Sequence, residues 1–536
     1  MGNKTINFCG ESLCFLRLIH NKIGEKSMKK TVVTAILLLA FTTPVLAVTE
    51  IEPDKTQKQA LTITDYGVKA GDILYMSDCV RLAVKNSPKI KKAEEDLKIA
   101  YSDVNLAKSN YFPTFGLSAR FFQEFNSLSE YDSGTAHTYL PTVGVYLNQL
   151  IWDFGKTSSM INMQKFNKLA AEYNYIESVC DTINEIKLNY FAVLKAKSIV
   201  DTEKDNYDIN KKILDDAKAK LTNNTKVKID YINAQVYFSN AKMRLEKAEN
   251  DYNQTMINLC NSMYVSGIPD FSVKKIDVFD SYDAFFTPNF LTTPKGQWHK
   301  TTNRPYETGL GRVQHLHFTM DKAIESAYAN SPDIKAINAT IQAMNQSVKV
   351  VKRQYLPVLS ANAGYNFNNR FRQDKEDYWQ RNSNYGIAVN LSTQINGMKF
   401  KNELAKSKSH VVKAEQNLKQ YKEDLYFAVK RCYMNVETAE KQILNAQDQT
   451  QKAIETLKMT GEDYAKNQAT YLELQSARQN YNNARISYAN VIYDYNSSLA
   501  KLQKAMHYNI DEIYYFAEQA NPNKNIKIDK NILDKE

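Results

Sequence analysis

Hydrophobic and polar residues alternate one by one in four separate stretches of the chain. Strict alternation over about ten residues is typical of a β-strand with one apolar and one polar face. The polar segments 123–140 and 368–383 join these stretches in pairs and predict exposed loops. The sequence therefore predicts two strand hairpins. Their strands are expected at about 114–122, 142–151, 358–367 and 385–393.

A period of three to four residues fills most of the remaining chain and predicts long helices. From Tyr231 to Leu259, and again from Leu474 to Leu502, apolar residues recur at heptad spacing, which predicts a coiled-coil seam. At about 1.5 Å per residue, the longest of these helices would span about 100 Å. The expected long helices are about 154–220, 229–262, 398–465 and 470–506.

The whole pattern occurs twice. Asn86-Ser87-Pro88 returns as Asn330-Ser331-Pro332, and Asp251-Tyr252-Asn253 returns as Asp494-Tyr495-Asn496, at nearly the same offset. An internal repeat of this length fixes the architecture before any site is considered. We therefore expect a mainly α fold with a small β part, built from two tandem units. The expected segments are an extension at 48–72, a first repeat at 73–263, a linker at 264–317, a second repeat at 318–508 and a tail at 509–536.

Each unit is expected to open with two short helices. Ser77 and Thr319 are predicted N-caps of the first, because a hydroxyl can accept a backbone N–H at a helix start. In the second, Ser87 and Ser331 precede a proline at the first helical position. A later Tyr-x-Pro sequence ends this helix, since the residue before proline avoids the α region.

The N-terminal part predicts export. Met28 starts a basic, then apolar segment that ends at Ala47, which is the pattern of a signal peptide at 1–47 with the true start at Met28. Beyond Ala47 no apolar run reaches the length of about 18 residues that a membrane-spanning helix needs. With only 17 glycines and 12 prolines, the chain favours long helices over a compact α/β enzyme.

Charge and chemical motifs exclude several classes of protein. The first 47 residues carry a net +4 of the total +10, and the mild excess that remains predicts a solvated surface rather than nucleic-acid binding. Two histidines, His315 and His317, are too few ligands for a zinc site, which normally has three or four. No phosphate loop, HExxH or GxSxG motif is present, so we expect no enzyme, metal or cofactor. Beyond Ala47 the chain has four cysteines, and none of them forms a CxxC pair. They predict buried free thiols and are Cys79, Cys180, Cys260 and Cys432.

Four amphipathic strands cannot close a barrel alone, because known membrane barrels begin at about eight strands. An open sheet would leave backbone groups unsatisfied in lipid. Several copies would therefore have to combine their strands and, with them, their helical hairpins. An exported chain with these strands and a long helical body suggests an outer-membrane barrel that extends into the periplasm.

The repeated order of helix, proline stop, strand hairpin, long helix and returning helix resembles the TolC-like family of outer-membrane efflux proteins. The resemblance covers about residues 73–508. It implies a homotrimer with a twelve-stranded barrel in outer-membrane lipid and a helical tunnel in the periplasm. The local signatures that carry it are Met76-x-x-Cys79-Val80-x-x-Ala83 with Asn86-Ser87-Pro88, Gln149-x-Ile151-Trp152-Asp153-x-Gly155, and Asp230-x-x-Asn233-Ala234.

The resemblance also implies partners. It predicts an exit duct in a tripartite efflux or type I secretion system, docked to a periplasmic adaptor (membrane fusion) protein. The inner-membrane transporter would be of the RND, ABC or MFS class. The alternative is a soluble periplasmic coiled-coil scaffold or adaptor. An adaptor should have one hairpin in a β-rich, glycine-rich half, whereas this sequence has two hairpins and little glycine.

The family's tunnel narrows where each long helix turns into the returning helix. The turns here are predicted at Asn223-Asn224 and Asn467, where the family usually has glycine. Asparagine is the next-best residue for a left-handed backbone. Asp230 and Glu473 stand six residues later, where the family places an acidic residue.

In the second unit this position resembles the family's ring of acidic residues at the aperture. Three carboxylates around one axis would repel one another and attract cations. The family's second acidic position is Ser476 here and its gating arginine position is Ala469, so a single ring from Glu473 is predicted, with Tyr464 as a gating aromatic. Alternatively, Glu473 lies on a solvated face of a coiled coil.

Aromatic residues near the strand ends have two interpretations. They could form aromatic girdles at the edges of a bilayer. They could equally pack in the core at the junction between strands and helices. The residues concerned are Trp152, Phe121, Phe122, Tyr139 and Tyr146.

Overall fold

The structure is a computed structural model, and it describes residues 71–127, 135–219, 225–265, 271–274, 318–373, 378–466 and 468–507. The predicted signal peptide at 1–47 and the tail at 509–536 lie outside the described residues, as do nearly all of the 48–72 extension and most of the 264–317 linker.

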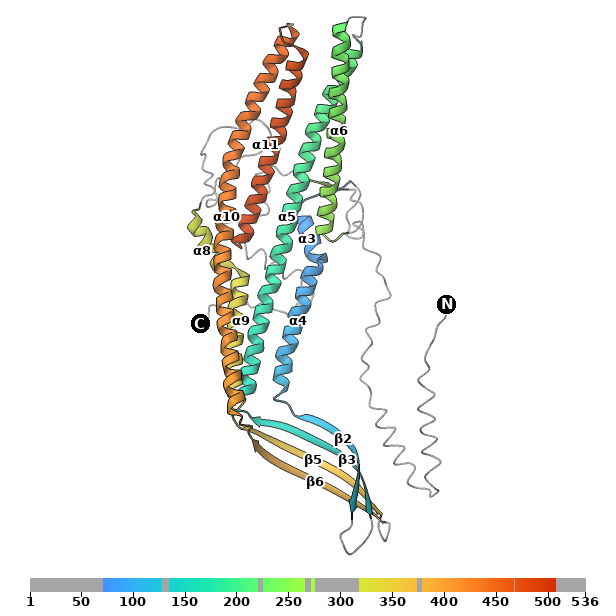
Figure 1. Cartoon of the computed structure of the whole chain (residues 1–536), viewed down its shortest axis with the longest axis vertical. Helices are drawn as coiled ribbons and strands as arrows, with labels where there is room; N and C mark the ends of the chain where they lie inside the picture. Colours follow the sequence, from blue (N-terminus) through green and yellow to red (C-terminus); the bar gives the residue numbers. More distant parts are fainter. Residues whose placement is uncertain are drawn as a thin grey trace, which may run out of the picture. The chain divides into compact units, whose positions relative to one another are not determined.

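The first repeat contains four helices and a strand hairpin (Figure 1). Its two short helices lead into the hairpin, and its two long helices follow. The elements are β1 (Ile73–Leu74), α3 (Met76–Asn86), α4 (Pro88–Ser109), β2 (Thr114–Ser127), β3 (Thr135–Trp152), α5 (Lys156–Ala219) and α6 (Thr225–Ser262).

The second repeat has the same order, which confirms a mainly helical fold with tandem units and a small sheet. The short strand β4 precedes it and pairs in parallel with β1. The elements are β4 (Ser272–Val273), α8 (Met320–Asn330), α9 (Pro332–Arg353), β5 (Val358–Gln373), β6 (Tyr378–Ser392), α10 (Gly397–Ala465) and α11 (Tyr471–Ala505).

Most of the predicted caps are present. Ser87 and Ser331 accept backbone N–H groups from Ile90 and Ile334 at 3.4 and 3.3 Å. Thr319 accepts the N–H of Lys322 at the start of α8. The assignment of Ser77 is wrong, because α3 begins at Met76 with Tyr75 as its N-cap, two residues earlier than predicted. The carboxylate of Asp78, in the first turn of α3, accepts the Tyr75 backbone N–H at 3.2 Å.

The strands extend well beyond the stretches that the alternation predicts. Pairing between β2 and β3 continues to Ser127 and Thr135, and pairing between β5 and β6 continues to Arg372 and Tyr378. The segments predicted as long loops are therefore largely strand. Ladder hydrogen bonds use only the backbone, so a strand can continue where its side chains are polar and the alternation signal ends.

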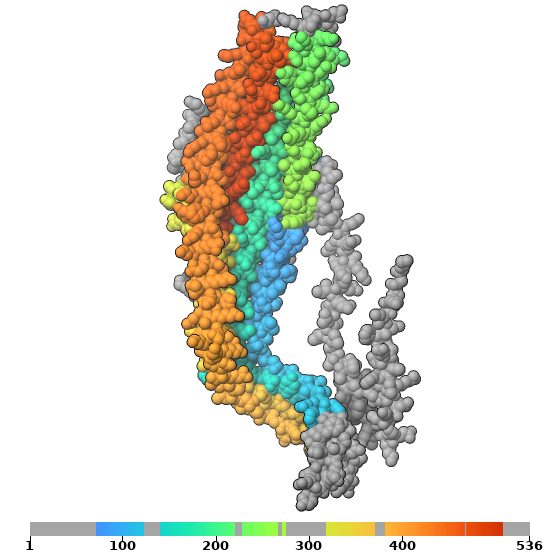
Figure 2. Space-filling model, in the orientation of Figure 1, coloured from blue at the N-terminus to red at the C-terminus, as the bar shows by residue number. Residues whose placement is uncertain are grey.

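Within the two long hairpins, α5 packs against α6 and α10 packs against α11. The heptad seam faces the partner helix in each case, with Ala234, Ala241 and Leu259 of α6 and Ala477 and Ala484 of α11 buried. Small residues at these positions let the helix axes approach closely. Contacts between α5 and α11 join the two hairpins, so α6 and α10 form the flanks (Figure 2).

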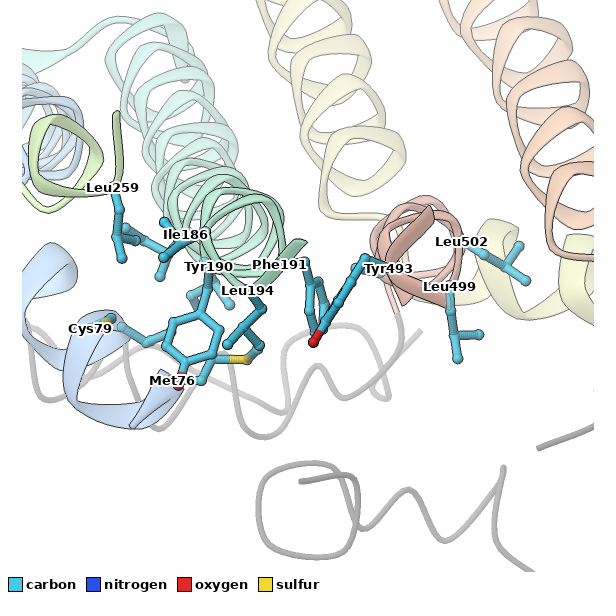
Figure 3. Packing of buried hydrophobic residues seen from close by; sticks show 14 of the residues in the cluster. Met76, Cys79, Ile186, Tyr190, Phe191, Leu194, Leu259, Tyr493, Leu499 and Leu502 are labelled. Carbon is cyan, nitrogen blue, oxygen red and sulfur yellow. The ribbon is translucent and has the colours of Figure 1, made fainter. Parts of the chain in front are cut away.

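The short helices α3 and α8 pack against the long helices α5 and α10, and the core around α3 includes Met76, Cys79, Ile186 and Leu259 (Figure 3). Three of the four cysteines are buried, and all four are free thiols. Burial raises the pKa of the Cys79 thiol to about 12.

A tyrosine at the same place in each long helix ties the start of each repeat to the core. The Tyr190 hydroxyl donates to the carbonyls of Leu74 and Lys274 at 3.1 and 2.9 Å, and so holds β1 beside β4. Its counterpart Tyr433 donates to the carbonyl of Phe318 at 3.0 Å.

Replacing Tyr190 by phenylalanine is expected to lower the free energy of unfolding by about 1–3 kcal/mol, because buried carbonyls lose a donor while the ring still fills its site. Tyr433→Phe, at a partly buried bond to a single carbonyl, should cost less. Denaturant unfolding of both variants in detergent checks this order. Equal stability of wild type and Tyr190→Phe would contradict the anchoring role.

Candidate functional site

The four long strands form one antiparallel sheet in the order β2-β3-β5-β6. Its register gathers the apolar side chains on one face, in rows that cross all four strands. Rows of small and polar residues point to the other face. One apolar row is Phe115, Leu147, Ala363 and Ile387, the next is Leu117, Val145, Tyr365 and Tyr385, and a polar row is Ser118, Gly144, Asn366 and Asn384.

The apolar face has no covering layer among the residues that the structure describes. Tyr385 and Ile387 on β6 are 87% and 85% exposed, and Phe115 on β2 is 77% exposed. A contiguous exposed apolar face on this scale marks a surface that contacts lipid or another protein.

Both edges of this sheet are also open within the described part of the chain. β2 and β6 are the edge strands, with 14 and 15 residues. Each presents a row of unpaired backbone N–H and C=O groups, which can pair with a strand of another chain. Long edges without a bulge or cover are rare in proteins that remain monomers, so these edges indicate assembly.

The register places the five aromatic residues predicted at a membrane interface on two different faces of the sheet. Trp152 pairs with Leu359 and Phe121 lies in line with Leu117, so both belong to the apolar face. By the register, Tyr139 belongs to the same face of the sheet as Phe121, but its side chain lies outside the described part of the structure.

Tyr146 and Phe122 leave the sheet on its polar side. The Tyr146 ring lies over Gly116, where an added Cβ would come within 2.0 Å of the ring. Glycine at 116 therefore provides the space that the tyrosine occupies.

The flanking helix α6 carries an apolar stripe on the face away from α5. At 100° per residue, its members fall within about 80° of one another and opposite the buried seam of Ala234 and Ala241. These residues are about half exposed. They are Ile229, Ile232, Val236, Met243 and Ile257.

The other flank, α10, has a similar stripe on the face away from α11. Its members fall within about 100° of one another, and the buried Val436 and Ile443 lie on the other side. The two stripes thus lie on opposite flanks of the four-helix arrangement. The α10 residues are Val412, Phe427, Met434, Leu444 and Met459.

At the hairpin end of α11, Glu473 has a local structural role. Its carboxylate accepts the Thr470 N–H at 2.7 Å, and the Thr470 hydroxyl accepts the Glu473 N–H at 3.3 Å. This reciprocal pair is a capping box. The Thr470 backbone and hydroxyl hydrogen bonds lower the pKa of Glu473 below its ordinary value of 4.5. The signal, Thr-x-x-Glu before an apolar series, is visible in the sequence.

Tyr464, the predicted gating aromatic, belongs to a cluster of tyrosines that no sequence pattern predicts. Its ring lies 6.5 Å from Tyr471 of α11, which in turn meets Tyr237 of α6 at 6.2 Å. Arg478 lies near Tyr471 and Tyr464, and burial lowers the pKa of its guanidinium. Its Nη1 atom is buried and has no hydrogen-bond partner in the described part of the structure. The cluster links both hairpins close to their ends.

Asp230, the first-repeat counterpart of Glu473, is exposed in α6. The predicted turn residues Asn223, Asn224 and Asn467 lie outside the described residues. Within the described part of the chain, no group of three or more His, Cys, Asp or Glu side chains could hold a metal ion. None of the helices described is both long enough and apolar enough to cross a membrane.

Comparison with known proteins adds an independent finding. The family model described as outer membrane efflux protein matches residues 79–263 and 323–506, that is, both repeats. No curated protein sequence matches the chain.

Solved structures share the fold. The CmeC outer membrane channel of Campylobacter jejuni is 16% identical over 84% of this chain and 90% of that chain, with a TM-score of 0.63. The open-state MtrE outer membrane channel of Neisseria gonorrhoeae is 14% identical over 80% and 88%, with a TM-score of 0.60. The outer membrane protein VceC of Vibrio cholerae is 14% identical over 80% and 95%, with a TM-score of 0.58.

Proposed function

The chain belongs to the outer membrane efflux protein family, and from this premise we propose that three copies form one exit duct across the outer membrane and periplasm. The observation that carries the proposal is the open sheet, which has one exposed apolar face and two unpaired edges. Four strands per chain, pooled from three copies, give twelve strands, enough to close a barrel.

Closure of the barrel would resolve both unfavourable features of the sheet. Pairing β6 of one copy with β2 of the next satisfies the edge N–H and C=O groups, which find no partner in lipid. The apolar rows would then face lipid, and the polar rows, with Tyr146 and Phe122 near them, would face a water-filled interior. In this barrel, Trp152, Phe121 and Tyr139 would form the aromatic girdle at the membrane interface.

The helices support the same assembly. If β6 meets β2 of the next copy, α10 of one copy approaches the α4 and α6 flank of the next. The exposed apolar stripes of α6 and α10 would then be buried against one another, closing a periplasmic tube of helices. The soluble scaffold or adaptor remains the runner-up, but it gives no role to the apolar face of the sheet.

The duct works with other proteins in this proposal. A periplasmic adaptor docks on the helical tube, and an inner-membrane transporter of the RND, ABC or MFS class supplies the cargo, in a tripartite efflux or type I secretion system. A duct that only conducts needs no catalytic residue and no cofactor. Purified protein in planar bilayers should give discrete ion currents. Well-folded protein that inserts and yields no current would contradict the duct.

We further propose that Glu473 gives the narrow periplasmic end its cation preference. Its carboxylate is exposed even while it caps α11, so three copies could form one acidic ring. Glu473→Gln is expected to lower the cation selectivity of the single-channel current and to weaken block by multivalent cations several-fold. Glu462→Gln removes an exposed carboxylate from α10 near the same end and should leave both unchanged.

The variant Thr470→Val distinguishes the role of Glu473 in the acidic ring from its role in the helix cap. It disrupts the capping box but keeps the charge of Glu473. This variant should be less stable yet keep cation block. The cap's contribution is complete above the unfolded pKa of Glu473 and is lost as the pH falls through its lower folded pKa. If cation block survives in Glu473→Gln, Glu473 is only a helix cap.

A further inference from the structure

Basic side chains gather where α9 and α10 approach the sheet. Residues 345–356 and 397–410 carry seven Lys or Arg against one Glu, a net +6. Arg353 is five residues before β5, and Lys399 is seven residues after the end of β6. We call this set the basic cluster: Lys349, Lys352, Arg353, Lys399, Lys401, Lys406 and Lys408.

The excess of charge is specific to this place. The matching segments of the first repeat, 101–112 and 153–166, carry a net charge of only +1. The other half of α10, residues 432–465, carries a net −3. Since both repeats have the same fold, the fold itself does not require the basic cluster.

Most of the cluster is free to bind a ligand. The one acidic residue, Glu403, accepts the Tyr355 hydroxyl at 2.9 Å and lies 3.8 Å from Lys399. Lys401, Lys406 and Lys408 are exposed, and no carboxylate in the described part of the chain pairs with them. Three ammonium groups over about two helical turns therefore remain available.

We propose that the basic cluster binds the headgroups of anionic phospholipids in the leaflet on the helical side of the membrane. The inference rests on the proposed function, which puts the apolar sheet in lipid and thus the adjoining helix ends at headgroup level. Lysine suits this place, because its aliphatic stem can lie along apolar surface while the ammonium reaches a phosphate. Clusters of basic residues next to a membrane attract anionic lipid.

The test compares two triple variants of the full-length protein in nanodiscs that contain phosphatidylglycerol in phosphatidylcholine. The first is Lys401→Gln, Lys406→Gln, Lys408→Gln. The matched control, Lys441→Gln, Lys452→Gln, Lys458→Gln, makes the same charge change in the acidic half of the same helix. The readout is the number of phosphatidylglycerol molecules that stay with each chain after extraction in mild detergent.

The first variant should bind phosphatidylglycerol about a hundredfold more weakly and so lose it on extraction, as expected for three lysines at an anionic surface, while the control retains it. Retention by the wild type should survive millimolar inorganic phosphate, which distinguishes lipid from free phosphate. Equal retention by both variants would overturn the proposal. So would unchanged retention with altered anion selectivity of the channel current, because the lysines would then face the duct. Failure of all three proteins to insert would instead contradict the membrane duct.

Discussion

Ile387→Arg is expected to abolish assembly of the protein in the outer membrane. Ile387 is 85% exposed on β6, in the apolar row with Phe115, Leu147 and Ala363. In the proposed barrel this side chain faces lipid. A charge there costs about 2–4 kcal/mol near the bilayer centre, and three copies multiply the cost. Outer-membrane fractionation followed by gel analysis without heating would measure the assembled form.

Asn384→Arg is the matched control for this prediction. Asn384 is three residues away on the same strand and is also exposed, but it belongs to the polar row with Ser118, Gly144 and Asn366. The same charge there would face water, so assembly should be preserved. Equal loss with both substitutions would mean that the two faces do not meet different environments.

Val236→Glu is expected to dissociate the assembly by opposing contact between the helical flanks. Val236 lies in the middle of the α6 stripe and is 54% exposed in the single chain. Burial against α10 of a neighbouring copy would remove its side chain from water, where a carboxylate without a partner costs several kcal/mol. In an assembly of three copies, the substituted side chain would be present at each of the three interfaces between neighbouring chains. Cross-linking and native gels of detergent-extracted protein would show the shift to smaller species.

The adjacent Gln235→Glu provides the control. Gln235 is exposed on the same turn, outside the stripe, and its only described side-chain bond is to the Tyr231 hydroxyl at 3.0 Å. A new carboxylate there should be solvated and tolerated. Dissociation by both variants would indicate a general effect of charge on α6 and would remove the stripe as evidence for an interface.

Much of the fold follows from the sequence, because its signals are periodic and occur twice. Alternation in 114–122 predicts not only β2 but also the face on which Phe115 and Leu117 lie, and the heptads predict the buried Ala234 and Ala241. Strand length does not follow, since the ladder continues to Ser127 where polar side chains give no signal.

The candidate site follows only in part. Thr470-x-x-Glu473 shows the cap in the sequence. Arg478, in contrast, is partly buried near Tyr464 and Tyr471, and no local sequence pattern relates it to them. Tyrosine is a residue type that is common at membrane interfaces. Only the register of Tyr146 opposite Gly116 shows that its side chain lies on the polar face of the sheet. Long-range pairing is the information that a single sequence lacks.

The most direct test of the shared barrel is the number of chains in the particle extracted from outer membranes in mild detergent. Light scattering with a correction for bound detergent gives this number. The shared sheet and the exposed flanks predict three copies per particle, recovered from the outer-membrane fraction. A monomer recovered from the soluble periplasmic fraction would contradict the duct, and the coiled-coil scaffold would then explain the fold better.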